Sequence, residues 1–166
     1  MLFRKATIED ADAVSEIYDL ARESLKRNEI PQWQNGVPGR DTFLVDVSHG
    51  VSYVMELGGE VIATIQIIEN EPYYANVVDG NWRSNNALVA HRVAVKVGCR
   101  HDGVGSKLLE AAAKIAVESG KDSLRLDTHE KNFKMRGMLE KNGFVYVGKV
   151  YMPGGEERFA YEKLLK

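Results

Sequence analysis

The 166-residue chain carries 22 lysine and arginine residues against 24 aspartate and glutamate residues, so its formal net charge is −2. This near-neutral balance argues against a nucleic-acid binder, which normally shows a basic excess or stripe, and no apolar run approaches the ~20 residues that cross a bilayer. The N-terminus lacks the apolar stretch of a secretory signal, and the lone Cys99 offers neither an internal disulfide nor a metal-ligand pair. We therefore expect one cytoplasmic domain, residues 1–166, that uses no metal, nucleic acid or membrane and acts on a small molecule or an exposed side chain.

The first half of the chain predicts a strand, two helices and a hairpin. Thr7 followed by Asp10 is close to a capping box, and apolar residues then recur at helical spacing. The pair Gly58-Gly59 is a two-residue hairpin signal between two apolar segments. The predicted elements are a strand over 2–6, a helix from 8 to about 28, a loop over 28–40, a helix over 41–47, and strands over 52–57 and 60–69.

The second half alternates strands with helices after a long loop. Residues 70–86 hold proline, glycine and aromatic residues, and loops of this length in compact domains are often functional. The predicted elements that follow are strands over 87–97, 123–128, 144–150 and 158–164, and helices over 103–120 and 132–142. This order predicts a mixed α/β sheet covered by helices, without an internal repeat or a linker.

The most informative segment runs from Val93 to Leu109 and reads as a strand, a glycine-bearing turn and the start of an amphipathic helix. Such a turn points backbone N–H groups at one place, where the helix dipole also favours an anion such as a pyrophosphate. The segment is not a P-loop, because Val104 follows Gly103 where a lysine is needed, and Leu108 stands where a dinucleotide fingerprint needs its third glycine. A plain tight turn that starts a helix remains the alternative.

The motif Arg100-x-x-Gly103-x-Gly105 resembles the Arg/Gln-x-x-Gly-x-Gly/Ala motif of the GNAT superfamily of acetyl-CoA-dependent N-acetyltransferases. The strand over 91–95 occupies the place of the family's fourth strand, and Asn132 with the later Gly143-Phe144 resembles the family's Asn that opens a helix ending in Gly-Phe. The resemblance implies the GNAT (acyl-CoA N-acyltransferase) fold, a mixed, mostly antiparallel sheet of about seven strands flanked by about four helices, with splayed central strands.

The resemblance also implies how acetyl-CoA, the acyl-donor cosubstrate, would be held. Its pantetheine arm would pair with the backbone of the fourth strand like an added strand, and its pyrophosphate would sit on the amides of the turn. Asn132 would contact the pantetheine or the adjoining part of the cofactor, and Lys134 a phosphate. The implied cofactor-binding residues are Val93, Ala94, Val95, Arg100, His101, Asp102, Gly103, Val104, Gly105, Ser106, Asn132 and Lys134.

The implied reaction is direct attack of a neutral primary amine on the thioester in a ternary complex. The backbone N–H of Val95 would polarise the carbonyl, and the amine must lose a proton to a base. The candidates are His91, for which a hydrogen-bonded structural histidine is the alternative, and Glu69 and Glu71, for which solvated loop acids are the alternative. The aromatic residues of the irregular segments are candidates for the wall of the acceptor site, or else pack their own loops down: Trp33, Tyr73 and Tyr74.

One departure from the family concerns the general acid. Leu139 stands seven residues after Asn132, where many members carry a tyrosine that protonates the departing thiolate. The absence of this tyrosine keeps open a second function, a non-catalytic sensor or interaction module that binds acetyl-CoA. The anion-binding turn, taken alone, keeps open a third, a nucleotide-binding domain unrelated to CoA. The acceptor class stays open among small-molecule amines, peptide N-termini and lysines. The resemblance also implies a homodimer or a larger assembly, although no apolar patch in this sequence identifies a partner surface, and the oligomeric state stays open.

Overall fold

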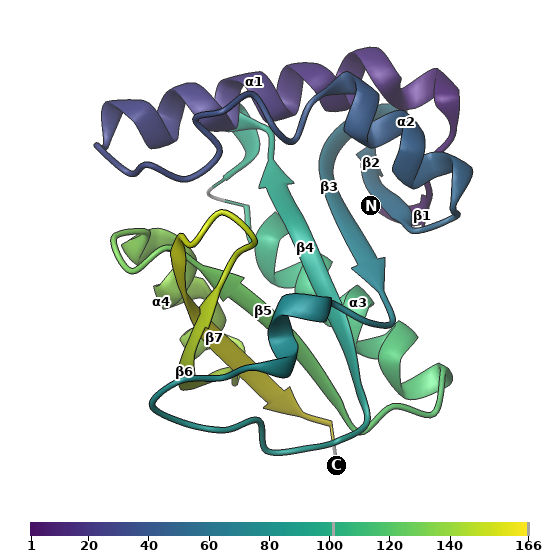
Figure 1. Cartoon of the computed structure of the whole chain (residues 1–166). Coiled ribbons are helices and arrows are strands. Elements are labelled where there is room, and N and C mark those ends of the chain that lie inside the picture. The colour runs from purple at the N-terminus through teal and green to yellow at the C-terminus, as the bar shows by residue number, and fades with distance from the viewer. Residues whose placement is uncertain (101, 166) are drawn as a thin grey trace. The chain divides into compact units, whose positions relative to one another are not determined.

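The computed structural model describes residues 1–100 and 102–165, and the chain forms two compact units. The first unit comprises Met1–Ile67 and Arg92–Leu108, and the second comprises Ile68–His91 and Leu109–Lys166. Figure 1 follows the chain from its N-terminus to its C-terminus. Within the described residues, no helix is both long and apolar enough to span a bilayer.

The described residues form seven strands, four α-helices and three short 3-10 helices. The strands are β1 (Leu2–Lys5), β2 (Ser52–Leu57), β3 (Glu60–Ile68), β4 (Ala87–Val95), β5 (Ser123–Thr128), β6 (Val145–Tyr151) and β7 (Glu157–Leu164). The helices are α1 (Ala11–Arg27), α2 (Arg40–Ser48), α3 (Val104–Glu118) and α4 (Phe133–Lys141), with 3-10 turns η1 (Ile8–Asp10), η2 (Pro72–Ala75) and η3 (Val97–Cys99).

The strands follow the order β1-β2-β3-β4-β5-β7-β6. Strand β4 belongs to both units: its residues 87–89 pair in parallel with β5 in the second unit, and Lys96 N–H, just after its end, donates to Ile62 O of β3 in the first. The β1–β2, β2–β3, β5–β7 and β6–β7 pairs are antiparallel. The predicted mixed, mostly antiparallel sheet with four helices is therefore confirmed.

Two predicted segments differ in detail from the structure. The strand expected over 87–97 ends at Val95, because Val97–Cys99 turns into η3. The loop expected over 70–86 contains η2, which Pro72 begins. Proline is favoured at the first position of a helix, because its ring already fixes a suitable φ and no hydrogen bond from its N–H is needed there. Both differences lie next to the segments that carry the candidate site.

The core of the first unit lies under helix α1, whose apolar residues fall on one face. Tyr18 of α1 packs in one cluster with Phe43 of α2, Val54 of β2 and Ala94 of β4. The side chain of Trp33, from the loop between the helices, lies against this cluster with its ring edge toward Tyr18, 5.9 Å between centroids.

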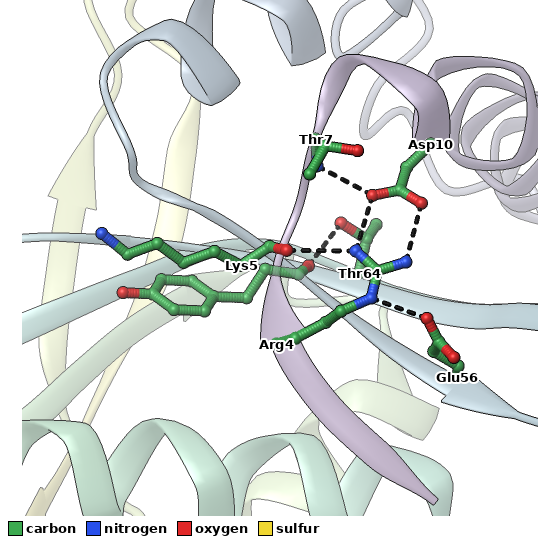
Figure 2. A network of polar contacts seen from close by, with 7 residues as sticks. Arg4, Lys5, Thr7, Asp10, Glu56 and Thr64 are labelled. Atoms are coloured by element: carbon green, nitrogen blue, oxygen red, sulfur yellow. Dashed lines mark hydrogen bonds and ion pairs between the residues drawn. The ribbon is translucent and has the colours of Figure 1, made fainter.

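A charged network joins β1, β2 and the start of α1 (Figure 2). The Arg4 guanidinium donates to both carboxylate oxygens of Asp10 at 2.9 Å, and its Nε donates to Glu56 at 2.6 Å. The Thr7 N–H also donates to Asp10, at 2.8 Å, which is one half of the predicted capping box. The hydrogen bond from Arg4 lowers the pKa of Asp10, burial acts the other way, and the Thr7 amide adds to the lowering.

We expect Asp10→Asn to reduce the free energy of unfolding at pH 7 by about 2 kcal/mol, the usual range for a charge-assisted hydrogen bond. Because the folded pKa of Asp10 is depressed, its contribution is present above the unfolded value near pH 4 and is lost as the pH falls through the folded pKa. Urea unfolding at pH 7, 5 and 3 should therefore show the gap closing toward pH 3. Asp12→Asn is the matched control, since the Asp12 side chain is 92% exposed in its pair with Arg40 and such pairs contribute little.

In the second unit, the chain between η2 and β4 is hydrogen-bonded to the edge strand β6. Val78 and Lys149 exchange two backbone hydrogen bonds of 2.8 Å. Nearby, a Cβ added to Gly80 would lie 1.8 Å from the carbonyl oxygen of Val147. Tyr74, Val89, Val147, Val150 and Ala160 form the core cluster beneath this segment. The close backbone approach at Gly80 explains why a glycine stands there.

Gly80→Ala should lower the free energy of unfolding by about 3 kcal/mol, because no side-chain rotation relieves a clash with a backbone oxygen. Gly137→Ala in α4 is the control with the opposite sign: its Cβ would meet nothing within 4 Å, and alanine is the better helix former by about 1 kcal/mol. Urea unfolding followed by circular dichroism measures both. Equal stability of the Gly80→Ala protein and the unchanged chain would contradict the close approach.

Candidate active site

The turn after β4 lies in the first unit and starts helix α3. Cys99 N–H donates to Lys96 O, Asp102 N–H donates to Cys99 O, and Lys107 N–H donates to Gly103 O as the first bond of the helix. Gly103 has φ +71, a left-handed conformation, and a Cβ there would meet nothing within 4 Å. The first N–H groups of an α-helix have no acceptor within the helix. The residues around Gly103 therefore form an open cradle that suits an anionic group.

The side chain of Arg100 braces this turn against the first unit. Its Nη1 donates to Ser24 Oγ of α1 at 3.1 Å, and its Nε lies 3.4 Å from Val95 O at the end of β4. Burial, and then the nearby charge of Arg27, lowers the pKa of Arg100. The guanidinium thus holds the turn to the end of the strand. His101, also predicted to bind cofactor, lies outside the described residues.

Asn132 and Lys134, the other predicted cofactor contacts, lie in the second unit at the start of α4. Asn132 is the N-cap of this helix, and its Oδ1 accepts from Met135 N–H at 3.2 Å. Lys134 is exposed. Leu139 on the same helix is 0% exposed, so the position at which the resemblance implied a proton-donating tyrosine is part of the core in this chain.

A cluster of titratable side chains in the second unit surrounds His91. The His91 Nε2 lies 2.7 Å from Oε2 of Glu71, and its Nδ1 lies 3.7 Å from Oδ2 of Asp127 on β5. The first distance is a hydrogen bond and the second is an electrostatic contact only. All three side chains are largely buried, with 7% to 18% exposure. The predicted candidate His91 is thus held between two carboxylates.

Two neighbouring tyrosines complete this cluster. Tyr73 and Tyr74 both donate their hydroxyls to Oδ2 of Asp127, at 2.8 and 2.6 Å, and both rings pack against the His91 ring. Burial, and then the charge of Asp127, raises the pKa of both hydroxyls. They therefore remain protonated donors at neutral pH, and both donate to the side chain of Asp127 beside His91.

A cavity of about 310 Å³ opens beside this cluster in the second unit. Two carboxylates, Glu69 and Glu71, lie on its wall together with aromatic and aliphatic side chains. The lining residues are Glu69, Asn70, Glu71, Pro72, Tyr74, Ala75, Trp82, Asn85, Ala87, Val89 and Arg125. Its volume is at the lower end of the range for small-molecule sites.

The cationic residue of the cavity wall, Arg125, forms an ion pair with the buried Glu162. Its Nε lies 3.2 Å from Glu162, whose side chain is 0% exposed, and its guanidinium lies 4.4 Å from the centre of the Trp82 ring. Ser123 Oγ also donates to Glu162, at 2.8 Å. Because the charge of Arg125 is balanced by Glu162, the carboxylates of Glu69 and Glu71 give the cavity wall an acidic character. Such a wall suits a cationic ligand.

Sequence reasoning missed Asp127 and the pairing of Glu71 with His91. Asp127 alternates with Arg125 along β5, so both lie on one face of the strand, but that spacing alone does not indicate chemistry. The predicted acceptor residues fall in different units: Tyr73 and Tyr74 belong to the His91 cluster, and Trp33 belongs to the core of the first unit. Among the described residues, no group of three or more His, Cys, Asp or Glu side chains is placed to hold a metal ion.

The mixed sheet, with a glycine turn and a helix N-terminus directly after strand β4, is the α/β arrangement that the sequence resemblance implied for an acyltransferase. The acetyltransferase (GNAT) family model matches residues 14–144 of the chain. The chain therefore belongs to the acetyltransferase (GNAT) family and is an N-acetyltransferase.

Individual relatives agree with this family. The uncharacterized N-acetyltransferase YhfO of Bacillus subtilis strain 168 is 26% identical over 147 residues, covering 87% of this chain and 89% of its own length. A GNAT-family acetyltransferase structure from Streptococcus agalactiae is 28% identical, with TM-score 0.88 over 98% of this chain and 94% of its own. The acetyltransferase yncA of Salmonella typhimurium, solved with acetyl-CoA, has the same fold at 20% identity, with TM-score 0.72 over 100% of this chain and 94% of its own.

Proposed function

We propose that the chain transfers the acetyl group of acetyl-CoA to the primary amine of a small cationic molecule, by direct attack in a ternary complex. The observation that carries this proposal is the open left-handed turn at Gly103, which leads from β4 into the N-terminus of α3. The Salmonella relative of the same fold was solved with acetyl-CoA, which supports the choice of donor. Because the family match runs through both compact units, we propose that residues 1–166 act as one domain.

The residues present fit an acetyl-CoA site. The space beside Gly103 is open, and a helix N-terminus attracts phosphate oxygens. We assign the pyrophosphate to the described residues of the turn from Arg100 to Ser106, with His101 added from the sequence, and the pantetheine to the backbone of Val93, Ala94 and Val95. The Val95 N–H would polarise the thioester carbonyl and stabilise the charge that develops on its oxygen. Asn132 and Lys134 complete the proposed set.

The proton of the acceptor amine goes, in this proposal, to the Glu71–His91 pair. Glu71 lies on the cavity wall, where an incoming ammonium would meet its carboxylate, and its other neighbour is the His91 imidazole at 2.7 Å. A carboxylate that is hydrogen-bonded to an imidazole can act as a general base. The exposed Glu69 on the same wall is the second candidate and would attract the cation.

The cavity favours a small cationic amine among the open acceptor classes. Tyr74, Trp82 and Val89 supply apolar walls, and the carboxylates of Glu69 and Glu71 supply negative charge. Aromatic side chains also attract cations through the faces of their rings. Tyr73 supports this wall through Asp127, while Trp33 remains a proposed acceptor contact from the first unit.

Two measurements test this function. Isothermal titration should show that acetyl-CoA and CoA bind and that ATP does not compete, and preferential binding of ATP would overturn the proposal in favour of a nucleotide-binding domain. Release of free CoA thiol should then follow addition of small alkyl- and arylalkylamines. Binding of acetyl-CoA without thiol release across a broad panel of amines, peptides and lysine derivatives would identify a sensor instead.

A further inference from the structure

Strand β4 contains a residue in an unusual conformation, directly after His91 and directly before Val93 in the sequence. Arg92 has φ +54, although it lies inside a strand and is not glycine. The other described non-glycine residues with positive φ all lie outside helices and strands, namely Glu29, Trp33 and Asp79. A left-handed conformation is costly for an L-residue and persists only where surrounding contacts hold it.

The Arg92 side chain is held by Asp46 of helix α2, and Asp46 is in turn held by Gln66 of strand β3, all within the first unit. The Arg92 Nη1 pairs with Oδ2 of Asp46, and the Gln66 Nε2 donates to Oδ1 of the same carboxylate at 3.0 Å. Asp46 is only 5% exposed, so each oxygen of a buried carboxylate has a donor. A buried carboxylate in this state binds its partners firmly, since removing one partner leaves a buried charge without compensation.

We propose that Asp46 is a positioning residue that acts through Arg92. Its carboxylate holds the Arg92 side chain, and thereby the left-handed backbone that follows His91 and precedes Val93. This backbone sets the direction in which the strand continues into Val93–Val95, the segment assigned to the thioester and the pantetheine. The proposal rests on the acetyltransferase function above. Reacting groups displaced by about 1 Å can lose about 100-fold in rate, so a group that holds this backbone matters for catalysis.

The first test compares Arg92→Gly with Arg92→Ala. Both lose the guanidinium, but glycine adopts φ +54 freely while alanine does not. We expect kcat of the alanine protein to be about tenfold below that of the glycine protein, with KM for the amine changed less than about twofold, because the reacting groups are misplaced rather than lost. Arg92→Lys, which keeps the charge, should recover part of the loss. Equal kcat in the glycine and alanine proteins would overturn the role of the backbone conformation.

The second test places Asp46→Asn in the unchanged chain and in Arg92→Gly. If Asp46 acts through Arg92, the change lowers kcat about tenfold in the unchanged chain and has no further effect in the glycine background. Equal losses in both backgrounds, or no loss in either, would overturn the proposal. Asp10→Asn is the control, a buried carboxylate of the same unit that should change stability and leave kcat unchanged.

Titration of acetyl-CoA into the same four proteins separates this inference from the proposed function. The backbone of Val93–Val95 is expected to bind the cofactor, so the same non-additive pattern should appear in the dissociation constant even without turnover. An unchanged chain that neither binds acetyl-CoA nor releases thiol overturns the proposed function. Binding with additive effects of Asp46→Asn and Arg92→Gly overturns the positioning role alone.

Discussion

Replacement of Glu71 by glutamine is expected to lower kcat for amine acetylation by about 100-fold or more, the usual cost of losing a general base. Glutamine keeps the size and one hydrogen bond toward His91, so the local structure should survive. It cannot take up the proton that the attacking amine loses, and it leaves the imidazole without the carboxylate 2.7 Å from its Nε2. The measurement is release of CoA thiol across pH 6 to 10 at saturating acetyl-CoA.

The matched control is Glu69→Gln on the same cavity wall. Glu69 is exposed, so its loss should raise KM for a cationic amine and change kcat less than about tenfold. Affinity for acetyl-CoA should be unchanged in both proteins, since neither carboxylate lies in the turn that is assigned to the cofactor. The reverse result, a large loss of kcat in Glu69→Gln and a small one in Glu71→Gln, would assign the base to Glu69.

The elements around the candidate site could be predicted because their signals are local. The strand that leads to Val95, the glycine at 103 and the apolar spacing of α3 lie within one short stretch, and each follows from backbone preference or side-chain period. The capping role of Asn132 is local in the same way. The 3-10 turn at Pro72–Ala75 was missed because an irregular, proline-containing segment has no periodicity to read.

The His91 cluster could not be predicted, because its members meet only through the fold. Glu71 and His91 are 20 residues apart, and Tyr73 and Asp127 are 54 apart. Sequence reasoning named His91, Glu71 and the two tyrosines separately, the first two as candidate bases and the tyrosines as candidate walls of the acceptor site. The structure joins them through the Asp127 carboxylate, whose position on β5 carried no signal of its own.

Leu139 shows what a departure from a family pattern means physically. The resemblance implied a proton-donating tyrosine at this position, whereas the leucine side chain is fully buried in the second unit. In the proposed reaction, the CoA thiolate would leave without that donor or receive its proton from another group. Tyr73 and Tyr74 are poorly suited to this task, because their hydroxyls already donate to Asp127 and their pKa values are raised. A CoA thiol is an acceptable leaving group without protonation in the same step.

Gly103→Asp is expected to weaken acetyl-CoA binding by about 100-fold or more while the protein remains folded. The new side chain would enter open space, and aspartate tolerates the left-handed φ of +71 better than most residues. Its carboxylate would accept the N–H groups at the start of α3, which caps the helix and removes the donors intended for the phosphates. It would also repel their charge.

Two control variants separate the effect of the aspartate's charge from the effects of its size and of its position in the chain. Gly103→Asn has the same size without the charge and should lose only about tenfold in affinity, because an interaction between full charges is missing. Gly120→Asp has the same kind of backbone, φ +75 with open space, but lies just past the C-terminus of α3, where a carboxylate is disfavoured by the helix dipole. It should lower stability slightly and leave affinity unchanged. Isothermal titration of acetyl-CoA measures the affinity of all three proteins, and thermal melts measure their stability. Unchanged affinity in Gly103→Asp would refute the assignment of the turn to the pyrophosphate.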